Sequence, residues 1–468
     1  MSNRHDVIIL GSGSTAFASA LRACSHGARV AMIEKSVLGG TCINWGCIPS
    51  KTLIHGAQTY EEARRATGLG IEVAPGGVDF ASLAAHKDEV VRHLRQTRYL
   101  DLLREVPGLT LVKGTGRLLD SRTVEVEGQR HASERILVAT GGFPQVLRIP
   151  GLPEVEYLTS RSALLLRRLP ESLIIIGGGV IALELGQMFQ RFGTRVTVLE
   201  HGPRVLLPVE EEPVLAVQKA LQADGIEIIV NAMICLVERE GETTRVEAEI
   251  GGRRQSFRAQ RLLLAVGTAP ATAGIGLEEV GVALDGKGFI RVDEHMRTTV
   301  PGIWAAGDVV GGMMIATVGA REGIVAVDDM FNPGCGCRMD YLQAPMAIFT
   351  DPEVGMVGLG EEGARAAGFD VATNILPVSA IPKARVTGNT AGVVKMVADR
   401  GSGRLLGVHL ACHLGADLIN EAAVALRARL TVEELANTLH VYPSMSEGLR
   451  LCAQGFNRDV SKLSCCAE

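Results

Sequence analysis

Aromatic residues and blocks of charge are both scarce in this sequence. Aromatic side chains make up 4% of the 468 residues, yet 47% are hydrophobic and 21% charged, a composition that is globular and too apolar for a disordered chain. The 47 Lys and Arg and the 52 Asp and Glu leave a formal net charge of -5 and are spread along the chain. Because nucleic-acid-binding proteins carry a basic patch or stripe, we expect no nucleic-acid partner.

Long apolar runs and a signal peptide are also lacking. The longest apolar stretch, residues 173–186, contains Glu184 and is shorter than the about 20 residues that cross a bilayer. Residues 1–6 lead directly into the apolar residues 7–10, which leaves no room for the charged and apolar regions of a signal peptide. We therefore expect a cytoplasmic protein with no membrane span.

Two segments of the chain begin in the same way. Each has an apolar strand, a glycine turn, a helix of small residues and a second strand, followed by an acid 21 residues after the second glycine of the turn. This context is typical of a dinucleotide-binding fold, in which the helix N-terminus faces the pyrophosphate and the acid accepts hydrogen bonds from the ribose. The sequence therefore predicts two bound nucleotides, the first held by Gly11, Gly13 and Glu34 and the second by Gly177, Gly179, Ala182 and Glu200.

Further strand and helix patterns follow these two segments. Residues 135–139 and 261–266 read as strands that run into glycine turns at Thr140 and Gly267, and a further strand ends at Asp308. From about residue 341, alternating strand-like runs are followed by helices around residues 417–427 and 432–439. At roughly 100–200 residues per domain, this length and pattern predict several compact units.

The ten cysteines are too few for a disulfide scaffold, so closely spaced pairs are expected to carry chemistry. Cys42 and Cys47 lie in the segment Gly-Gly-Thr-Cys-Ile-Asn-Trp-Gly-Cys-Ile-Pro-Ser-Lys. An ideal helix separates such positions by roughly 8–9 Å, beyond the about 7 Å limit for a disulfide, so pairing requires a distortion that Gly46 permits. A helix N-terminus beside a basic residue favours the thiolate. Two buried structural cysteines are the alternative.

This segment resembles the redox-active signature of the pyridine nucleotide-disulfide oxidoreductases, which include lipoamide dehydrogenases, glutathione reductases and mercuric reductases. The resemblance covers essentially the whole chain. It implies FAD, a nicotinamide coenzyme, a homodimer, and electrons that pass from nicotinamide through flavin to the cysteine pair. Cys47 would face the flavin, Cys42 would meet the substrate, and Lys51 and Glu184 would pair near the reactive flavin nitrogen. The residues implied in FAD binding are Ser14, Ala16, Glu34, Ser36, Thr41, Lys51, Gly116, Thr140, Asp308 and Ala316.

The expected fold class is α/β, with two Rossmann-like dinucleotide-binding domains, for FAD and NAD(P), and a C-terminal α+β dimerisation domain. The FAD domain is expected at residues 1–150, continuing at 274–340. The NAD(P) domain is expected at 151–273, with Gly267 near its end, and the dimerisation domain at 341–456. Residues 457–468 are expected to form a flexible tail that carries a vicinal cysteine pair.

Two departures from the dithiol-reducing members of the family decide the expected substrate. Those members carry a segment resembling His-x-His-Pro-x-x-x-Glu, and this chain has Tyr442 in place of the second His, between His440 and Glu447. With an unperturbed pKa near 10, against about 6.5 for His, tyrosine is a poor proton shuttle at neutral pH. The tail ends with Cys465 and Cys466, and adjacent thiols suit a soft, thiophilic metal ion.

Together with the Cys42/Cys47 pair, these features resemble the mercuric reductases, whose chains end in a very similar Leu-Ser-Cys-Cys. The implied reaction is reduction of Hg(II), arriving as a thiol complex, to volatile Hg(0). Cys465 and Cys466 would collect the ion and pass it to Cys42 and Cys47 of the partner subunit, with Tyr442 as a weak ligand or gate. The alternatives are a lipoamide dehydrogenase or other disulfide reductase, and a non-catalytic thiol protein that sequesters metal.

The coenzyme and several cysteines are left open by the sequence. Glu200 favours NADH on physical grounds, because a carboxylate repels the 2′-phosphate of NADPH. The resemblance favours NADPH instead, and Arg204, four residues after Glu200, could meet that phosphate. We expect Cys335 and Cys337 to be an exposed loop pair, with an auxiliary soft-metal site as the alternative. A second candidate metal cluster, at a strand end, consists of His409, Cys412 and His413.

Overall fold

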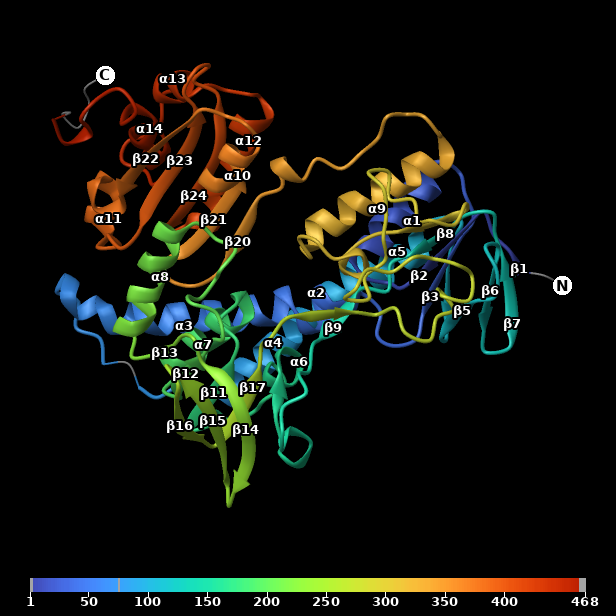
Figure 1. The fold of residues 1–468 in the computed structure, drawn as a ribbon, viewed down its shortest axis with the longest axis horizontal. Helices are drawn as coiled ribbons and strands as arrows, with labels where there is room; N and C mark the ends of the chain where they lie inside the picture. The colour runs from blue at the N-terminus through green and yellow to red at the C-terminus, as the bar shows by residue number, and fades with distance from the viewer. Residues whose placement is uncertain (1–2, 75, 463–468) are drawn as a thin grey trace.

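The computed structural model describes residues 3–74 and 76–462. The first sheet, seen at the right of Figure 1, is parallel with strand order β19-β8-β2-β3-β4. Its central strand β2 is buried along its whole length, which is why it reads as an unbroken apolar run rather than an alternating one. The strands are β2 (Val7–Leu10), β3 (Val30–Glu34), β4 (Leu109–Lys113), β8 (Ile136–Val138) and β19 (Ile303–Ala305).

Two helices cover one face of this sheet and a small second layer covers the other. Helices α1 (Ser14–Ser25) and α9 (Ala316–Phe331) pack side by side although they are far apart in the sequence. The second layer has strand order β1-β7-β6-β5. It consists of β1 (Asn3–Arg4), β5 (Gly116–Leu118), β6 (Thr123–Val126) and β7 (Gln129–Ala132).

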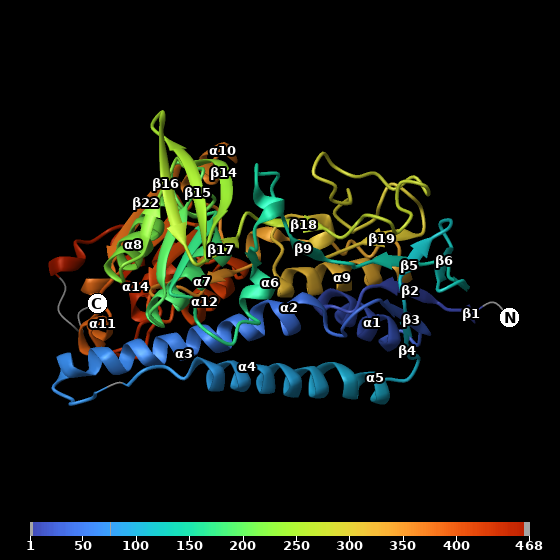
Figure 2. The same ribbon diagram turned by 90° about the horizontal axis from the view of Figure 1, so that it is seen from below.

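A long helical hairpin follows β3 and runs along the length of the molecule (Figure 2). Helix α2 (Gly40–Trp45) leads into α3 (Cys47–Arg65), and α4 (Phe80–Arg95) returns beside α3 after the 3-10 turn Ala66–Leu69. The Asp79 side chain accepts the backbone N–H of Ser82 at 3.1 Å and so begins α4 as an N-cap. The π-helical residues Gln96–Leu100 and α5 (Asp101–Glu105) complete the return to β4.

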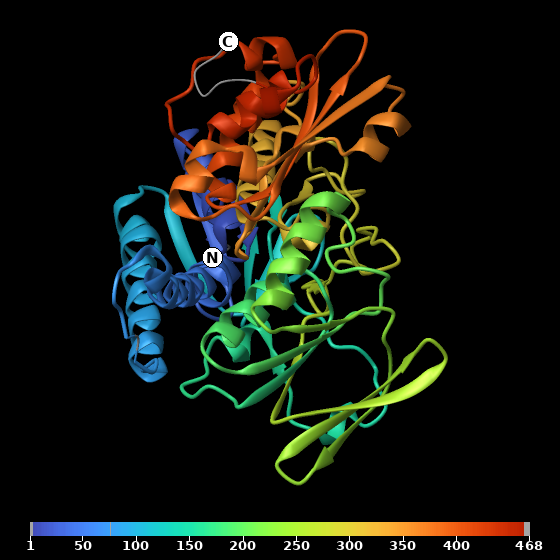
Figure 3. The ribbon, with the colours of Figure 1, turned by 90° about the vertical axis from the view of Figure 1, so that its left-hand side faces the viewer.

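A second parallel sheet has the order β10-β17-β11-β12-β13 and repeats the strand, turn and helix plan of the first. A three-stranded antiparallel sheet extends from it, at the lower right of Figure 3. The elements are β10 (Leu158–Thr159), α6 (Ser160–Ala163), β11 (Ser172–Ile176), α7 (Val180–Arg191), β12 (Arg195–Leu199), α8 (Glu211–Ala223), β13 (Glu227–Ile229), β14 (Met233–Glu240), β15 (Thr243–Ile250), β16 (Arg253–Ala259) and β17 (Arg261–Leu264).

The segments that follow the two parallel sheets pair with each other. Strand β9 (Gly142–Pro144) follows the first sheet and β18 (Thr268–Pro270) follows the second, and they pair antiparallel with Phe143 opposite Ala269. This ribbon brings the Thr140 turn and the Gly267 turn to the same region of the molecule. It therefore places the two nucleotide turns on either side of one junction.

The C-terminal unit is an antiparallel sheet with helices, at the top of Figure 3. Its strand order is β20-β21-β24-β23-β22, and β24 is buried along its whole length. Its strands are β20 (Met346–Ile348), β21 (Glu353–Gly358), β22 (Val371–Pro377), β23 (Val393–Asp399) and β24 (Leu405–Cys412). Its helices are α10 (Glu361–Ala366), α11 (Pro382–Thr387), α12 (Gly415–Arg427), α13 (Val432–Ala436) and α14 (Glu447–Gln454).

The predicted α/β fold class is confirmed. One local expectation is wrong: α13 ends at Ala436, not near Leu439, because Leu439 is 88% exposed and has no core against which a helical face would pack. Within residues 3–74 and 76–462, no helix combines the length and the apolar character that a bilayer crossing demands.

Candidate active site

The first glycine turn is built for close approach of the backbone to a ligand. Gly11 has φ of +113°, and a Cβ there would lie 2.2 Å from the carbonyl oxygen of Ala139. Helix α1 begins at Ser14 with Gly13 as its N-cap and no side-chain cap, so its first N–H groups are left for a ligand. A Cβ on Gly40 would lie 2.5 Å from the Cα of Gly13, so α2 also approaches this turn closely.

The acid at the end of β3 is held in a fixed position. Ser12 Oγ donates to Glu34 Oε2 at 2.6 Å, and the backbone N–H of Ser36 donates to Glu34 Oε1 at 2.6 Å. Glu34 borders the cavity that contains Gly11 and Thr140. Ser36 itself acts through its backbone on Glu34, and Ala16 is buried within α1, so neither side chain lines the groove.

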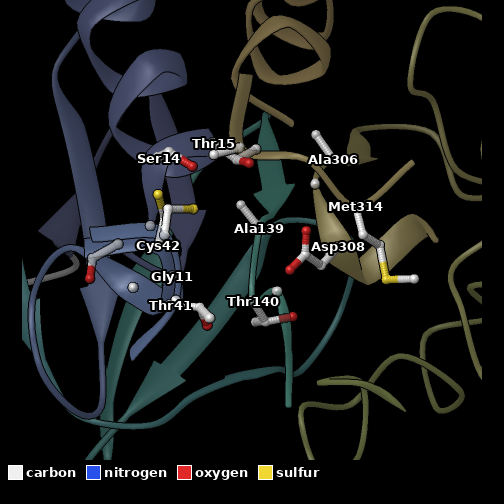
Figure 4. A pocket seen from close by; sticks show the side chains of 18 of the residues that line it. Gly11, Ser14, Thr15, Thr41, Cys42, Ala139, Thr140, Ala306, Asp308 and Met314 are labelled. Carbon is white, nitrogen blue, oxygen red and sulfur yellow. The ribbon is translucent and has the colours of Figure 1, made fainter. Parts of the chain in front are cut away.

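Three segments that are far apart in the sequence enclose the groove (Figure 4). Ser14 and Cys42 come from the N-terminal segment, Thr140 follows β8, and Asp308 and Met314 come from the segment after β19. Burial raises the pKa of the Asp308 carboxyl. The adjoining part of the groove, near Glu34, contains Gly116. The remaining expected residues that line it are Gly11, Gly13, Thr41 and Ala316.

The residues present fit FAD. The Thr140 hydroxyl is buried and has no hydrogen-bond partner among the described residues, which is the condition of a polar group that a ligand satisfies. The free N–H groups at the start of α1 suit a pyrophosphate, and the fixed Glu34 carboxylate suits a ribose. The groove therefore brings together an anion site, a ribose acceptor and an unpaired hydroxyl.

The helix that carries the two thiols is interrupted between them. Helix α2 ends at Trp45, Gly46 has φ of -126° and ψ of -111°, and α3 begins at Cys47. This break removes the helical spacing that would keep the cysteines apart, and both line the groove as free thiols. A hydrogen bond between them raises the pKa of Cys42, and the same hydrogen bond together with the charge of Lys51 lowers the pKa of Cys47 to about 7. The pair thus combines a thiol that keeps its proton with one whose ionisation is favoured.

An ion pair adjoins the thiols on the side of the second sheet. Lys51 Nζ lies 2.7 Å from Glu184 Oε2, and the Glu184 side chain is only 5% exposed. The backbone N–H of Phe349 donates to Glu184 Oε1 at 2.9 Å, and Lys51 Nζ lies 4.6 Å from the centroid of the Phe349 ring. Lys51 and Glu184 share a cavity with Cys47, Val180 and Gly267, so the ion pair lies where the groove meets the start of α7.

The charge of Lys51 gives a first prediction. In a Lys51→Met variant we expect the pKa of Cys47 to rise above about 7, because the ammonium that favours the thiolate is gone. Alkylation of Cys47 by iodoacetamide at pH 7, followed by peptide mass spectrometry, should slow roughly threefold or more. The exposed Lys219→Met on α8 is the control and should leave the rate unchanged. Equal rates for all three proteins would remove Lys51 from this role.

The second glycine turn repeats the first. Gly177 has φ of +107°, a Cβ there would lie 2.4 Å from the carbonyl oxygen of Ala265, and α7 begins at Val180 with Gly179 as its N-cap. Ala182 is buried one turn into the helix. Glu200 accepts the backbone N–H of Gly178, and that of Gly202 at 2.5 Å.

The Arg204 side chain is hydrogen-bonded to the backbone of its own loop. Its guanidinium donates to three carbonyl oxygens, those of Leu206 at 3.1 Å, Leu207 at 2.7 Å and Val209 at 2.8 Å. These bonds hold the loop after β12 and occupy both terminal nitrogens. The acid Glu200, and not Arg204, is therefore the charged group presented beside the second turn.

Tyr442, which is expected beside the substrate, does not line the groove of its own subunit. Tyr442 is 47% exposed, lies between α13 and α14, and lines neither of the cavities that contain Cys47. His440 Nε2 lies 2.6 Å from Glu421 Oε1, an interaction that raises the pKa of His440. The buried Glu447 carboxylate accepts from Arg450 at 3.1 Å instead of from a histidine. Cys465 and Cys466 lie outside the described residues.

One group at the site has no counterpart in the sequence-based expectations. The Arg161 guanidinium lies 5.2 Å from the Trp45 ring, and Nη2 donates to the carbonyl oxygen of Gly142 at 2.9 Å and to Thr41 Oγ1 at 3.3 Å. Arg161 borders the cavity that contains Lys51, and its contacts connect α6 to helix α2, which carries Cys42. No local pattern predicts it, because all its partners come from other segments of the chain.

The second candidate metal cluster is not assembled. In the described ranges, no three His, Cys, Asp or Glu side chains are grouped to hold an ion. His409 Nε2 bonds to the carbonyl oxygen of Leu359 at 3.1 Å, and Cys412 is buried, which raises its pKa to about 12. Cys335 and Cys337 form a disulfide and are partly, not fully, exposed.

Comparison with known proteins identifies one family over nearly the whole chain. The profile described as pyridine nucleotide-disulphide oxidoreductase matches residues 5–323, and that of the dimerisation domain of the same family matches residues 344–453. The chain is 39% identical over 465 residues to the mercuric reductase of Lysinibacillus sphaericus, covering 99% of this chain and 85% of that protein. It is also 39% identical over 471 residues to the mercuric reductase of Streptomyces lividans, covering 99% and 98%.

Solved structures share the fold at full length. The flavoprotein disulfide reductase RclA of Escherichia coli, in its Cu(II) complex, is 32% identical with a TM-score of 0.87, over 97% of this chain and 99% of that one. LpdA from Mycobacterium tuberculosis is 28% identical with a TM-score of 0.86, over 97% and 100%. The family predicted from the redox segment is confirmed: the chain belongs to the pyridine nucleotide-disulphide oxidoreductases.

Proposed function

We propose that this enzyme reduces Hg(II), presented as a thiol complex, to Hg(0) with electrons from a nicotinamide coenzyme. The observation that carries the proposal is the thiol pair Cys42 and Cys47, one favoured as thiolate, at the junction of two nucleotide turns. Thiolates are the ligands that soft metal ions prefer. The similarity to proteins named mercuric reductase, at 39% identity, supports the same substrate.

The groove residues would hold FAD, which, when bound, supplies the two electrons of the reduction. The start of α1 would hold the pyrophosphate, Glu34 the ribose, and Thr140 and Asp308 further polar groups along the groove. The second turn, with Gly177, Gly179 and Glu200, would hold the nicotinamide coenzyme. The Lys51–Glu184 pair would order the region where the two meet, because the backbone N–H of Phe349 holds the Glu184 carboxylate in position.

Substrate capture is a thiol exchange at the cysteine pair. The Cys47 thiolate attacks the metal of Hg(SR)₂ and releases one thiolate, which takes up a proton as RSH. The Cys42 thiol then gives up its proton to the second departing thiolate as its sulfur bonds the metal, so the products are Cys42–S–Hg–S–Cys47 and two RSH. A Cys47 pKa of about 7 keeps much of this thiol ionised at neutral pH without making it a weak nucleophile.

We further propose that delivery to the pair crosses between subunits of a homodimer. The match to the family's dimerisation domain supports the dimer. Cys465 and Cys466 of one subunit would hand the ion to the catalytic pair of the other, with Tyr442 beside the metal. The division of the chain at residues 150, 273, 340 and 456, and a cytoplasmic setting in which thiols stay reduced, belong to the same proposal.

The decisive experiment measures coenzyme oxidation by the purified holoenzyme with HgCl₂ in excess thiol, and collects volatile mercury. Lipoamide and oxidised glutathione are assayed in parallel. We expect oxidation only with Hg(II), and loss of mercury from solution. Turnover with a disulfide alone would instead establish a disulfide reductase with a proton shuttle other than Tyr442.

A variant tests the role of the tail. Replacing both Cys465 and Cys466 with Ala should slow reduction of a bulky Hg(II) thiol complex roughly tenfold or more, because a tethered ligand pair acts at a millimolar effective concentration. Reduction of the flavin by the coenzyme, followed by its absorbance, should be unchanged. The paired substitution Ser461→Ala and Ser464→Ala is the control. Unchanged turnover of the cysteine variant would remove the tail from the mechanism.

The geometry beside the second turn favours NADH over NADPH. The Glu200 carboxylate is fixed by the N–H groups of Gly178 and Gly202, and Arg204 is occupied by carbonyl groups. We therefore expect a higher kcat/KM with NADH. In Glu200→Ala, kcat/KM with NADPH relative to NADH should rise roughly tenfold, equivalent to about 1.4 kcal/mol. Glu227→Ala, which removes an exposed acid from the neighbouring strand β13, should leave the ratio unchanged.

A further inference from the structure

A second cysteine pair lies in the loop that follows α9. Cys335 and Cys337 are joined by a disulfide, with their Cα atoms 5.3 Å apart and Gly336 between them at φ of +67°. Helix α9 begins at Ala316 in the cofactor groove and runs 16 residues to Phe331, a rise of about 24 Å. The pair therefore lies at the far end of α9 from Cys42 and Cys47, and forms a separate site.

Contacts from outside the loop hold the pair in place. The His295 Nδ1 atom donates to the carbonyl oxygen of Cys337 at 2.6 Å, and the backbone N–H of Met339 donates to the carbonyl oxygen of Glu294 at 3.3 Å. The loop is thus anchored at two points to the segment before β19. These anchors do not involve the sulfur atoms, so they keep the two side chains adjacent when the thiols are reduced.

The two sulfur atoms lie together at a partly exposed position. The backbone N–H of Cys337 donates to Cys335 Sγ at 3.2 Å, and the Arg338 guanidinium lies 3.9 Å from Glu294 Oε2. Both cysteines are partly exposed, so dissolved ions and small thiols reach them.

We propose that Cys335 and Cys337, when reduced, form an auxiliary binding site for a soft cation that accepts two thiolate ligands, with Hg(II) as its probe. Two sulfurs on one three-residue loop suit such an ion. In the described part of the chain no third His, Cys, Asp or Glu joins a cluster here, so the four ligands that structural zinc takes are lacking.

The chemistry needs one co-reactant, a low-molecular-weight thiol. Two RSH reduce the Cys335–Cys337 disulfide to two thiols and become RSSR. The two thiols then exchange with Hg(SR)₂, forming Cys335–S–Hg–S–Cys337 and releasing two RSH. No electron passes to the metal, so this site binds the ion without reducing it. It does not depend on the catalytic proposal, since binding is measured without a nicotinamide coenzyme.

The test counts mercury retained by the thiol-reduced holoenzyme. The protein is mixed with HgCl₂ in the presence of excess glutathione, passed through gel filtration without NADH or NADPH, and analysed for mercury per FAD. We expect the variant C335S/C337S to retain one Hg(II) fewer per subunit than the parent. The variant Cys235→Ser, which removes a partly exposed lone thiol, should retain as much as the parent.

A second variant keeps the test conclusive if C335S/C337S misfolds. Cys337→Ser leaves one thiol, which monothiol glutathione outcompetes, so retention should fall by the same one Hg(II) per subunit. Thiol counting of the parent should also show two more reactive thiols after reduction of the loop disulfide than the double variant does. Equal mercury retention by the parent and either variant would overturn the proposal, whether or not the enzyme reduces Hg(II).

Discussion

A Cys42→Ala variant is expected to lose Hg(II)-dependent oxidation of the coenzyme by roughly a thousandfold or more, as enzymes do when a residue that bonds the reacting atom is removed. The substitution acts twice. It removes one of the two sulfurs that hold the metal, and it removes the thiol whose hydrogen bond lowers the pKa of Cys47. The remaining Cys47 then takes a proton more readily and binds the metal through one bond only.

The measurement separates metal chemistry from flavin chemistry. Reduction of bound flavin by NADH or NADPH should persist in Cys42→Ala, because the Lys51–Glu184 pair and both glycine turns are unchanged. Alkylation of Cys47 should shift to higher pH. The control is Cys24→Ala, which removes a half-buried thiol on α1 that lies outside the groove. Substantial mercury reduction by Cys42→Ala would contradict the exchange at the cysteine pair.

The parts of the fold that follow from the sequence are those set by local spacing. Strand β2 and its turn are predictable because an apolar run, Gly11 and Gly13 are adjacent in the chain. The same reasoning places Glu34 at the end of β3, because a helix and a strand of fixed rise fill the interval. The interruption at Gly46 also follows, since two cysteines five residues apart meet only if their helix is broken.

Contacts between distant segments escape this reasoning. Arg161 contacts Trp45 and Gly142 from a distant segment of the chain, and the sequence around these residues carries no signal for the contact. The hydrogen bonds from Arg204 to three carbonyl groups could not be predicted from the sequence either, because they depend on how the loop after β12 folds back. The loop that carries Cys335 and Cys337 is also held by hydrogen bonds to residues 294–295, about 40 positions earlier in the chain.

Replacing Gly11 with Ala is expected to lower the free energy of unfolding by more than about 3 kcal/mol and to yield protein with little FAD. At φ of +113° an L-residue is strained, and the added Cβ would meet the Ala139 carbonyl oxygen at 2.2 Å. That oxygen belongs to the backbone just after β8, next to β2, so relief requires the two central strands to move apart. The same movement displaces Thr140 and the start of α1.

Gly27 serves as a control that separates the strain of a positive φ from the steric clash of an added Cβ. Gly27 has φ of +79°, and a Cβ added there would have no heavy atom within 4 Å, so Gly27→Ala should cost only about 1 kcal/mol. Thermal unfolding and the ratio of flavin to protein absorbance report both variants. Because the collision, and not the dihedral angle alone, breaks the groove, only Gly11→Ala should lose FAD. Equal FAD content in the two variants would show that the Gly11 turn tolerates a side chain and that the groove is not built around its close approach.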